Sequence, residues 1–172
     1  MRVLLGSAVL FLQLAGCAAF AQAAQGTLAR DALSLAWRTY LIPEYGTRVD
    51  YPAGIFSPSG PPGKGVGERF ETEDGRAVLT IYSHENSAGD TPAAYVRKNL
   101  RVKSAALDYQ RITGSFFAIS LEGDGLIYYS RCNFSGPARR VAHCFDLVYP
   151  QDEKRAWDPV VTRISLSLQP KQ

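Results

Sequence analysis

Apolar and polar residues alternate over many short segments of this chain, and a period of two is typical of strands that bury one face. The segments that show it predict strands at residues 47–52, 68–72, 77–83, 108–113, 115–123, 125–134 and 141–150, with an extended segment beginning near Trp37. Asp74-Gly75 and Asp124-Gly125 mark tight turns between neighbouring segments. Strands joined by such turns lie side by side and run antiparallel.

Two segments predict helices instead. Asp90-Thr91-Pro92 is a cap followed by proline in the first turn, which predicts a helix of about a dozen residues ending near Ser104. Asp158-Pro159 repeats this device, and apolar residues around it recur at near-helical spacing: Trp157, Val161, Ile164 and Leu168. The whole pattern predicts an α+β domain, in which an antiparallel sheet of about six to eight strands is covered by helices.

Residues 57–67 are rich in glycine and proline and are expected to form an exposed connecting loop. Gly63, Gly65 and Gly67 are spaced like part of a dinucleotide-binding loop. Such a loop must follow a strand and open a helix, so that backbone amides meet the pyrophosphate. Here turn residues precede the glycines and a predicted strand follows, so no nucleotide cofactor is expected.

The N-terminus indicates export. Arg2 precedes a nearly continuous apolar run, residues 3–14, which is typical of a signal segment and too short to span a bilayer. Ala21-Gln22-Ala23 resembles an ordinary signal-peptidase site, whereas Leu14-Ala15-Gly16-Cys17 resembles a lipobox in which Cys17 carries lipid. Both alternatives stay open, so we expect a periplasmic protein that is either soluble or lipid-anchored.

The length of 172 residues fits a single domain after an export signal. We assign residues 1–23 to the signal (or a signal ending before Cys17), 24–36 to a linker or short helix, and 37–169 to the domain. A hydrophobic content of 46% with 20% charged residues is that of an ordinary globular protein. The net charge of +3 is too small to indicate nucleic-acid binding.

Cys132 and Cys144 lie in two neighbouring predicted strands. A register that sets them opposite each other also sets Ser130 opposite Asp146, and Tyr128 opposite Val148. Directly opposite residues have Cβ atoms within about 5.5 Å, close enough for a disulfide, which an oxidising compartment favours. Two free thiols are the alternative. A metal site is weaker, because His143 beside Cys144 completes no ligand set.

Several short motifs resemble the PsbP-like family. They are Trp37-x-x-Tyr40, Tyr45-Gly46, Asp50-Tyr51-Pro52 with Phe56, the glycine-rich loop, Phe70, the Glu73-Asp74-Gly75 hairpin and the closing segment 158–168. Thr47 departs from the family's usual "YGF" turn. The resemblance is nearest to small exported proteins of proteobacteria. It implies an antiparallel sheet between helices and an accessory role, in which such proteins bind and stabilise larger assemblies; no site residue is carried over.

Catalytic motifs are absent from the sequence: there is no GxSxG and no HExxH. The chain has only two histidines, and His143 shares its strand face with Val141, Phe145 and Leu147. A histidine among apolar neighbours favours a structural role over that of a general base. A cofactor-independent hydrolase, with His84 or His143 as base and its other residues remote in sequence, is the rival hypothesis.

Two surfaces are candidates for binding. Basic residues gather largely on one side of the first predicted helix: Arg97, Lys98, Arg101 and, nearby, Lys103. They form either a solvated face or a surface for an acidic partner or anionic lipid, and a lipidated Cys17 would favour the latter. The aromatic residues near the N-terminus either pack in the core or line a cleft beside the glycine-rich loop: Tyr40, Tyr45, Tyr51, Phe56 and Phe70.

The sequence therefore predicts an exported, non-enzymatic accessory or binding protein without a cofactor. Its expected partner is another envelope protein or assembly. The alternatives are the hydrolase described above and a purely structural envelope lipoprotein.

Overall fold

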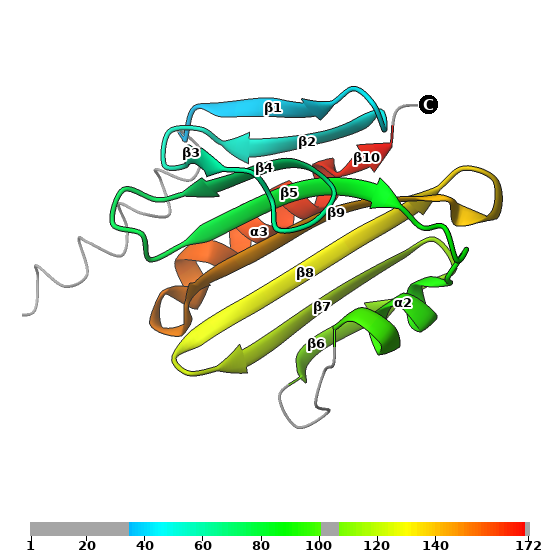
Figure 1. The fold of residues 1–172 in the computed structure, drawn as a ribbon. Coiled ribbons are helices and arrows are strands. Elements are labelled where there is room, and N and C mark those ends of the chain that lie inside the picture. Colours follow the sequence, from blue (N-terminus) through cyan, green and yellow to red (C-terminus); the bar gives the residue numbers. More distant parts are fainter. Residues whose placement is uncertain (1–34, 101–106, 171–172) are drawn as a thin grey trace, which may run out of the picture.

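The computed structural model describes residues 35–100 and 107–170, which form two antiparallel sheets and two α-helices (Figure 1). The strands are β1 (Trp37–Ile42), β2 (Thr47–Pro52), β3 (Ser57–Gly60), β4 (Val66–Glu71), β5 (Val78–Glu85), β6 (Leu107–Ile112), β7 (Phe116–Gly123), β8 (Leu126–Ser135), β9 (Val141–Pro150) and β10 (Gln169–Pro170). The helices are α2 (Pro92–Asn99) and α3 (Lys154–Ser167), and short 3₁₀ turns are η2 (Pro137–Arg139) and η3 (Gln151–Glu153).

The larger sheet has seven strands in the order β3-β4-β5-β9-β8-β7-β6, and the smaller sheet has the order β1-β2-β10. After β5 the chain passes through α2 to the edge strand β6. It then returns through three hairpins until β9 lies beside β5 (Figure 1). The predicted α+β class with antiparallel hairpins is confirmed, and the larger sheet has seven strands, within the six to eight expected. The separate three-stranded sheet was not predicted.

Strands β8 and β9 pair in the predicted register. It sets three pairs of residues opposite each other: Cys132 and Cys144, Ser130 and Asp146, and Tyr128 and Val148. The two cysteine sulfur atoms lie 1.98 Å apart, at bonding distance. Because side chains alternate along a strand, the cysteines point to one face of the sheet while Arg131 and His143 point to the other.

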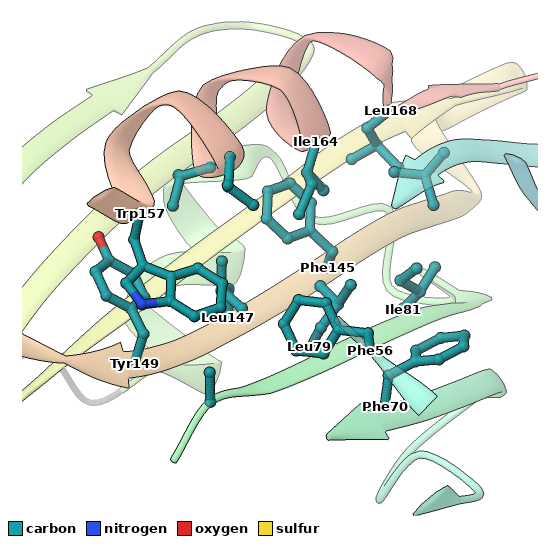
Figure 2. Packing of buried hydrophobic residues seen from close by; sticks show 14 of the residues in the cluster. Phe56, Phe70, Leu79, Ile81, Phe145, Leu147, Tyr149, Trp157, Ile164 and Leu168 are labelled. Carbon is teal, nitrogen blue, oxygen red and sulfur yellow. The ribbon is translucent and has the colours of Figure 1, made fainter. Parts of the chain in front are cut away.

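The main core lies between α3 and the larger sheet (Figure 2). Ile42 of β1 and Val49 of β2 belong to the same cluster. Alternate residues of β5 and β9 meet one face of α3: Leu79, Ile81, Phe145, Leu147 and Tyr149 against Trp157, Val160, Val161 and Ile164. The rings of Tyr149 and Trp157 stack with centroids 5.5 Å apart. Burial of each such side chain contributes roughly 1.5–3 kcal/mol, so this helix is held by its apolar face.

A smaller core covers the opposite face of the sheet beneath α2. It contains Tyr82, Tyr95, Phe117, Phe134 and the two paired cysteines. The predicted cap is confirmed, because the Thr91 hydroxyl accepts a hydrogen bond of 3.2 Å from the Ala94 amide. Helix α2 ends at Asn99, and the remainder of the expected helix falls largely in residues 101–106, outside the described residues.

Three elements of the fold differ from the sequence prediction. The expected loop 57–67 contains β3, which tolerates Pro58 because an edge strand does not need every amide. Helix α3 begins at Lys154, so Asp158 is not its cap and Pro159 lies inside it. The turn η3 leads directly into α3. The burial of the apolar face of α3 stabilises the helix by more than it loses from the backbone hydrogen bond that Pro159 cannot donate. Strand β10 has two residues, too few to show a periodic pattern.

Among residues 35–100 and 107–170, no helix has the length and apolar character needed to cross a bilayer. Cys17 and both processing sites lie outside the described residues, as do Arg101 and Lys103.

Candidate functional site

His143 forms a buried hydrogen-bonded chain where the two sheets meet. Its Nδ1 lies 2.6 Å from the hydroxyl of Thr47, which in turn lies 2.5 Å from the hydroxyl of Ser83. Its Nε2 lies 2.7 Å from the hydroxyl of Ser135. The ring is 0% exposed. Burial lowers the pKa of His143 to about 4, so the imidazole is neutral at neutral pH and both of its nitrogens have partners.

The contact between Ser135 and His143 has one element of a hydrolase site, a serine within hydrogen-bonding distance of a histidine. The other ring nitrogen meets the hydroxyl of Thr47, where a catalytic triad places a carboxylate. A fully buried ring cannot reach a substrate, and a pKa of about 4 makes a weak base at neutral pH. The geometry fits the structural interpretation of His143, in which it fastens β2 to β5, β8 and β9.

The second histidine belongs to a cluster on the α2 face of the sheet. The Tyr95 hydroxyl lies 2.8 Å from His84 Nε2 and accepts a hydrogen bond of 3.4 Å from Lys64 Nζ. The Lys64 ammonium lies 4.7 Å from the centre of the Tyr82 ring. Burial raises the pKa of Asp146, and the positive charge of Lys64 opposes this shift. The cluster therefore fastens the glycine-rich segment to β5, β9 and α2.

The glycines of that segment serve close packing. Gly65 has φ of +69°, and a Cβ there would lie 2.3 Å from the Ser83 carbonyl oxygen. At Gly67 a Cβ would lie 2.0 Å from the carbonyl oxygen of Ile81. The two glycines let β4 begin directly against β5; the strand starts at Val66, between them, and Gly67 lies within it.

The aromatic residues predicted from the N-terminal part pack mainly in the core. Phe56 and Phe70 are buried, and the rings of Tyr40 and Tyr51 lie 5.5 and 4.7 Å from that of Phe70. Tyr45 packs against the same cluster. Core packing is confirmed for these residues.

A cleft of about 690 Å³ lies at the end of the main core, between Ile55, Asp74 and Trp157. Three of its four charged lining residues have partners: Asp74 accepts hydrogen bonds from the Thr72 hydroxyl and the Arg76 amide, and Arg76 pairs with Glu153. Arg76 Nη1 donates a hydrogen bond of 2.5 Å to Glu153, and the Trp157 indole donates one of 3.0 Å to the same carboxylate. This pairing leaves the cleft with few free polar groups to orient a ligand.

The predicted basic face of α2 is described only in part. Arg97 and Lys98 are exposed, and Lys98 forms an ion pair of 2.5 Å with Asp90. This pair is formed within the same chain, which reduces the charge that the helix offers to a partner.

A different basic site lies on the opposite side of the molecule. Helix α3 leaves part of the sheet uncovered over β6, β7 and β8, and a groove of about 480 Å³ lies there. We name it the arginine groove after Arg111 and Arg131, which line it. Its lining also includes Phe116, Ala118, Tyr129 and Ser165. The strand pairing sets Arg111 opposite Ala118, and Ala118 opposite Arg131, so the two arginines flank a small residue in one row.

Arg131 is held in place by neutral groups. Its Nη1 donates a hydrogen bond of 2.7 Å to the Ser165 hydroxyl, and its Nε donates one of 3.2 Å to the Asn133 side-chain oxygen. The Tyr129 hydroxyl lies 3.1 Å from the same serine oxygen. Burial lowers the pKa of Arg131, and the nearby charge of Arg111 lowers it further. An arginine remains charged in proteins, so the groove holds a half-buried positive charge in a fixed orientation.

Both guanidinium groups lie close to the ring of Phe116. The Cζ atom of Arg131 is 4.6 Å from the centre of the ring, and that of Arg111 is 5.4 Å away. Within the described residues, neither arginine forms an ion pair with a carboxylate. Two like charges beside one aromatic ring repel each other, and an anion between them would offset that repulsion, so the two arginines favour a negatively charged ligand.

The acidic residues near the groove are largely engaged elsewhere. Lys154 Nζ donates hydrogen bonds of 2.7 Å to Asp108 and 2.9 Å to Glu122. Asp158 lines the groove and is exposed. In residues 35–100 and 107–170, no cluster of three or more His, Cys, Asp or Glu side chains is placed to hold a metal ion. The groove therefore presents guanidinium, hydroxyl and aromatic groups, together with the carboxylate of Asp158.

The basic residues predicted along the first helix do not include those of the arginine groove, although the sequence contains a signal for it. The cysteine register sets Arg131 opposite Phe145 in a central strand, facing the main core. A charged residue at such a position must either be paired or reach an opening. Arg111 and Phe116 could not be added in this way, because their proximity depends on the pairing of β6, β7 and β8.

No protein-family model matches the chain. No curated protein matches it either. Among solved structures it is similar to the solution structure of cyanobacterial PsbP (CyanoP) from Synechocystis sp. PCC 6803, with a TM-score of 0.58 and 16% identity over 79% of this chain and 93% of that one. A crystal structure from Bacteroides thetaiotaomicron VPI-5482 has a TM-score of 0.47 and 15% identity, over 78% of this chain and 48% of that one. The likeness to CyanoP shows that this chain has a PsbP-like fold.

Proposed function

We propose that this protein is an exported, non-enzymatic accessory protein of the cell envelope, which binds another envelope protein or assembly through the arginine groove. The observation that carries the proposal is that two arginines in an opening beside α3 form no ion pair with any carboxylate of residues 35–100 and 107–170. A charge held half-buried by neutral groups adds little to folding, and an anionic partner would make it favourable.

Two other observations support the proposal. Arg2 with the apolar run at residues 3–14 has the form of an export signal. The PsbP-like fold agrees with the accessory role that the family resemblance implies, although a fold by itself does not confer a function. Lipidation of Cys17 would hold the protein at a membrane, and metabolic labelling with palmitate tests this directly.

Cross-linking in cells followed by co-purification from membranes tests the proposal. The full-length protein is compared with a groove variant, Arg111→Gln with Arg131→Gln, and a matched variant of the basic helix, Arg97→Gln with Lys98→Gln. Both variants remove two positive charges. We expect a defined partner that is lost with the groove variant and retained with the helix variant.

Retention of the partner by a folded groove variant would contradict the proposed site. Loss of the partner only with the helix variant would assign binding to α2 instead. Circular dichroism and urea unfolding of both variants establish that they are folded before the comparison is made.

A further inference from the structure

We infer that the arginine groove binds the side-chain carboxylate of an aspartate or glutamate that a partner protein presents between apolar residues. The inference rests on the proposed function and names the chemistry of the partner. Arg111 and Arg131 would hold the carboxylate, and the exposed apolar surface beside them would hold its neighbours.

Arg131 is prepared for this role by its surroundings. The hydrogen bonds to Ser165 and Asn133 use one N–H of Nη1 and that of Nε, and they fix the plane of the guanidinium. The remaining N–H groups of a guanidinium can donate to both oxygens of one carboxylate. Because the side chain is already ordered, little conformational entropy is lost when the ligand binds.

The row Arg111–Ala118–Arg131 provides the space for the ligand. Ala118 lies on the strand between the arginines and contributes only a methyl group to the floor. Neighbouring strands are about 4.8 Å apart, so two arginines separated by one strand can approach a single group from both sides. Phe116 lies beside both guanidiniums and can contact the methylene groups of an aspartate or glutamate.

Apolar side chains at the rim extend the site beyond one carboxylate. Leu166 of α3 is 71% exposed, and Tyr109 of β6 is 45% exposed. Both line the groove. An apolar residue on either side of the bound carboxylate would cover these side chains, which are otherwise left in contact with water.

The charges around the groove favour a protein carboxylate over a membrane surface. In and beside the groove, basic and acidic residues are equal in number. The basic residues are Arg111, Arg131 and Lys154, and the acidic residues are Asp108, Glu122 and Asp158. An anionic bilayer would face both signs of charge and gain little attraction beyond the Debye length of about 10 Å. A single carboxylate placed between the arginines lies nearest to their two positive charges, whereas a bilayer spans the acidic residues as well.

The test uses purified protein and two short peptides, acetyl-Ser-Phe-Glu-Phe-Ser-amide and the same peptide with glutamine in place of glutamate. The two probes have the same shape and differ in one charge. NMR signals of the arginine Nε–H groups in ¹⁵N-labelled protein follow binding at the groove. We expect the glutamate peptide to bind with a Kd on the order of 1 mM, and the glutamine peptide at least tenfold more weakly.

Variants assign the binding to individual residues. Arg131→Lys keeps the charge but loses the planar fork, and we expect roughly tenfold weaker binding. Arg111→Gln, on the exposed side of the groove, is expected to weaken binding about threefold, the range of a partly exposed ion pair. Arg97→Gln on α2 is the matched control and should leave the Kd unchanged.

Each contrary result overturns the inference in a different way. Equal binding of the two peptides would show a purely apolar site. Tighter binding of inorganic phosphate than of the glutamate peptide would show a phosphate site, and Arg131-dependent binding to phosphatidylglycerol vesicles would show a membrane surface. If neither peptide binds while the membrane partner still depends on the groove, the carboxylate inference fails and the proposed function stands.

Discussion

The polar chain around His143 and the arginine groove lie on the same face of the sheet. They differ in the burial, the charge and the pairing of their polar groups. His143 is buried and neutral, and hydroxyl groups from two strands, β2 and β8, serve its two nitrogens. Arg131 is charged and half-buried, and its partners are neutral. The first arrangement is complete within the chain, whereas Arg131 forms no ion pair with a carboxylate of the described residues.

The difference separates a structural polar cluster from a candidate binding site. A buried polar group that is fully hydrogen-bonded stabilises the fold, and its removal leaves partners unsatisfied. A charge that lacks a counter-ion contributes little to stability and gains most when a ligand supplies the missing charge. Changes at His143 should therefore affect stability, and changes at the arginines should affect binding.

The largest effect is expected for His143→Ala. The substitution removes a fully buried ring and leaves the hydroxyls of Thr47 and Ser135 without it, which should lower the free energy of unfolding by about 3–4 kcal/mol. Urea unfolding followed by circular dichroism measures the change. A loss below about 1 kcal/mol would show that water or a rearrangement replaces the ring, and the structural role of His143 would be wrong.

Acid should lower the free energy of unfolding, because the same histidine takes up a proton more readily in the unfolded chain. The pKa of His143 is lowered to about 4 in the folded state, from 6.5. Between these values the unfolded chain binds a proton that the folded protein does not, so stability is full above pH 6.5 and falls as the pH approaches 4. The loss should total about 3 kcal/mol, since one pKa unit corresponds to about 1.4 kcal/mol.

Urea unfolding at a series of pH values isolates this contribution by a difference between variants. His84→Gln, in the α2-face cluster, should keep the slope of the wild-type protein between pH 6.5 and 4. His143→Ala should lose it. The same slope in both variants would assign the acid sensitivity to other groups.

Reduction of the Cys132–Cys144 disulfide shows whether peptide binding at the arginine groove depends on the stability of the whole fold. Closing the short loop between β8 and β9 contributes on the order of 3 kcal/mol, so reduction should lower the free energy of unfolding by about that amount. Intact mass with and without reductant establishes that the bond forms in the exported protein. An unchanged mass after reduction would refute the disulfide. Peptide binding at the groove should survive reduction wherever the protein remains folded.

The smallest effects on stability are expected at the groove. Arg111→Ala removes an exposed charge and should change the free energy of unfolding by no more than about 0.5 kcal/mol. Arg131→Met keeps an unbranched side chain beside Phe116 and should cost less than about 1 kcal/mol. A loss above about 3 kcal/mol at Arg131 would place it with His143, as a residue required for folding.

Part of the fold follows directly from local patterns in the sequence. Alternation gave most of the long strands, and the two cysteines gave the register of β8 and β9, because a slip of one residue would turn every side chain to the wrong face. Thr91 and Pro92 marked the start of α2. Strands β3 and β10 were not found, since the first lies in a proline-rich segment and the second has two residues.

The sequence by itself determined the class of the fold, the hairpins, the register at the cysteines and the burial of His143, because each depends on the period and spacing of nearby residues. Only the tertiary structure decided what His143 meets, since Thr47 is 96 residues away in the other sheet. It also decided that α3 leaves β6, β7 and β8 partly open, so that Arg111, Phe116 and Arg131 share one groove. The alternation of apolar and polar residues indicates which side chains lie on the same face of a sheet. The position of the helix that covers this face depends on packing between segments that are distant in the sequence.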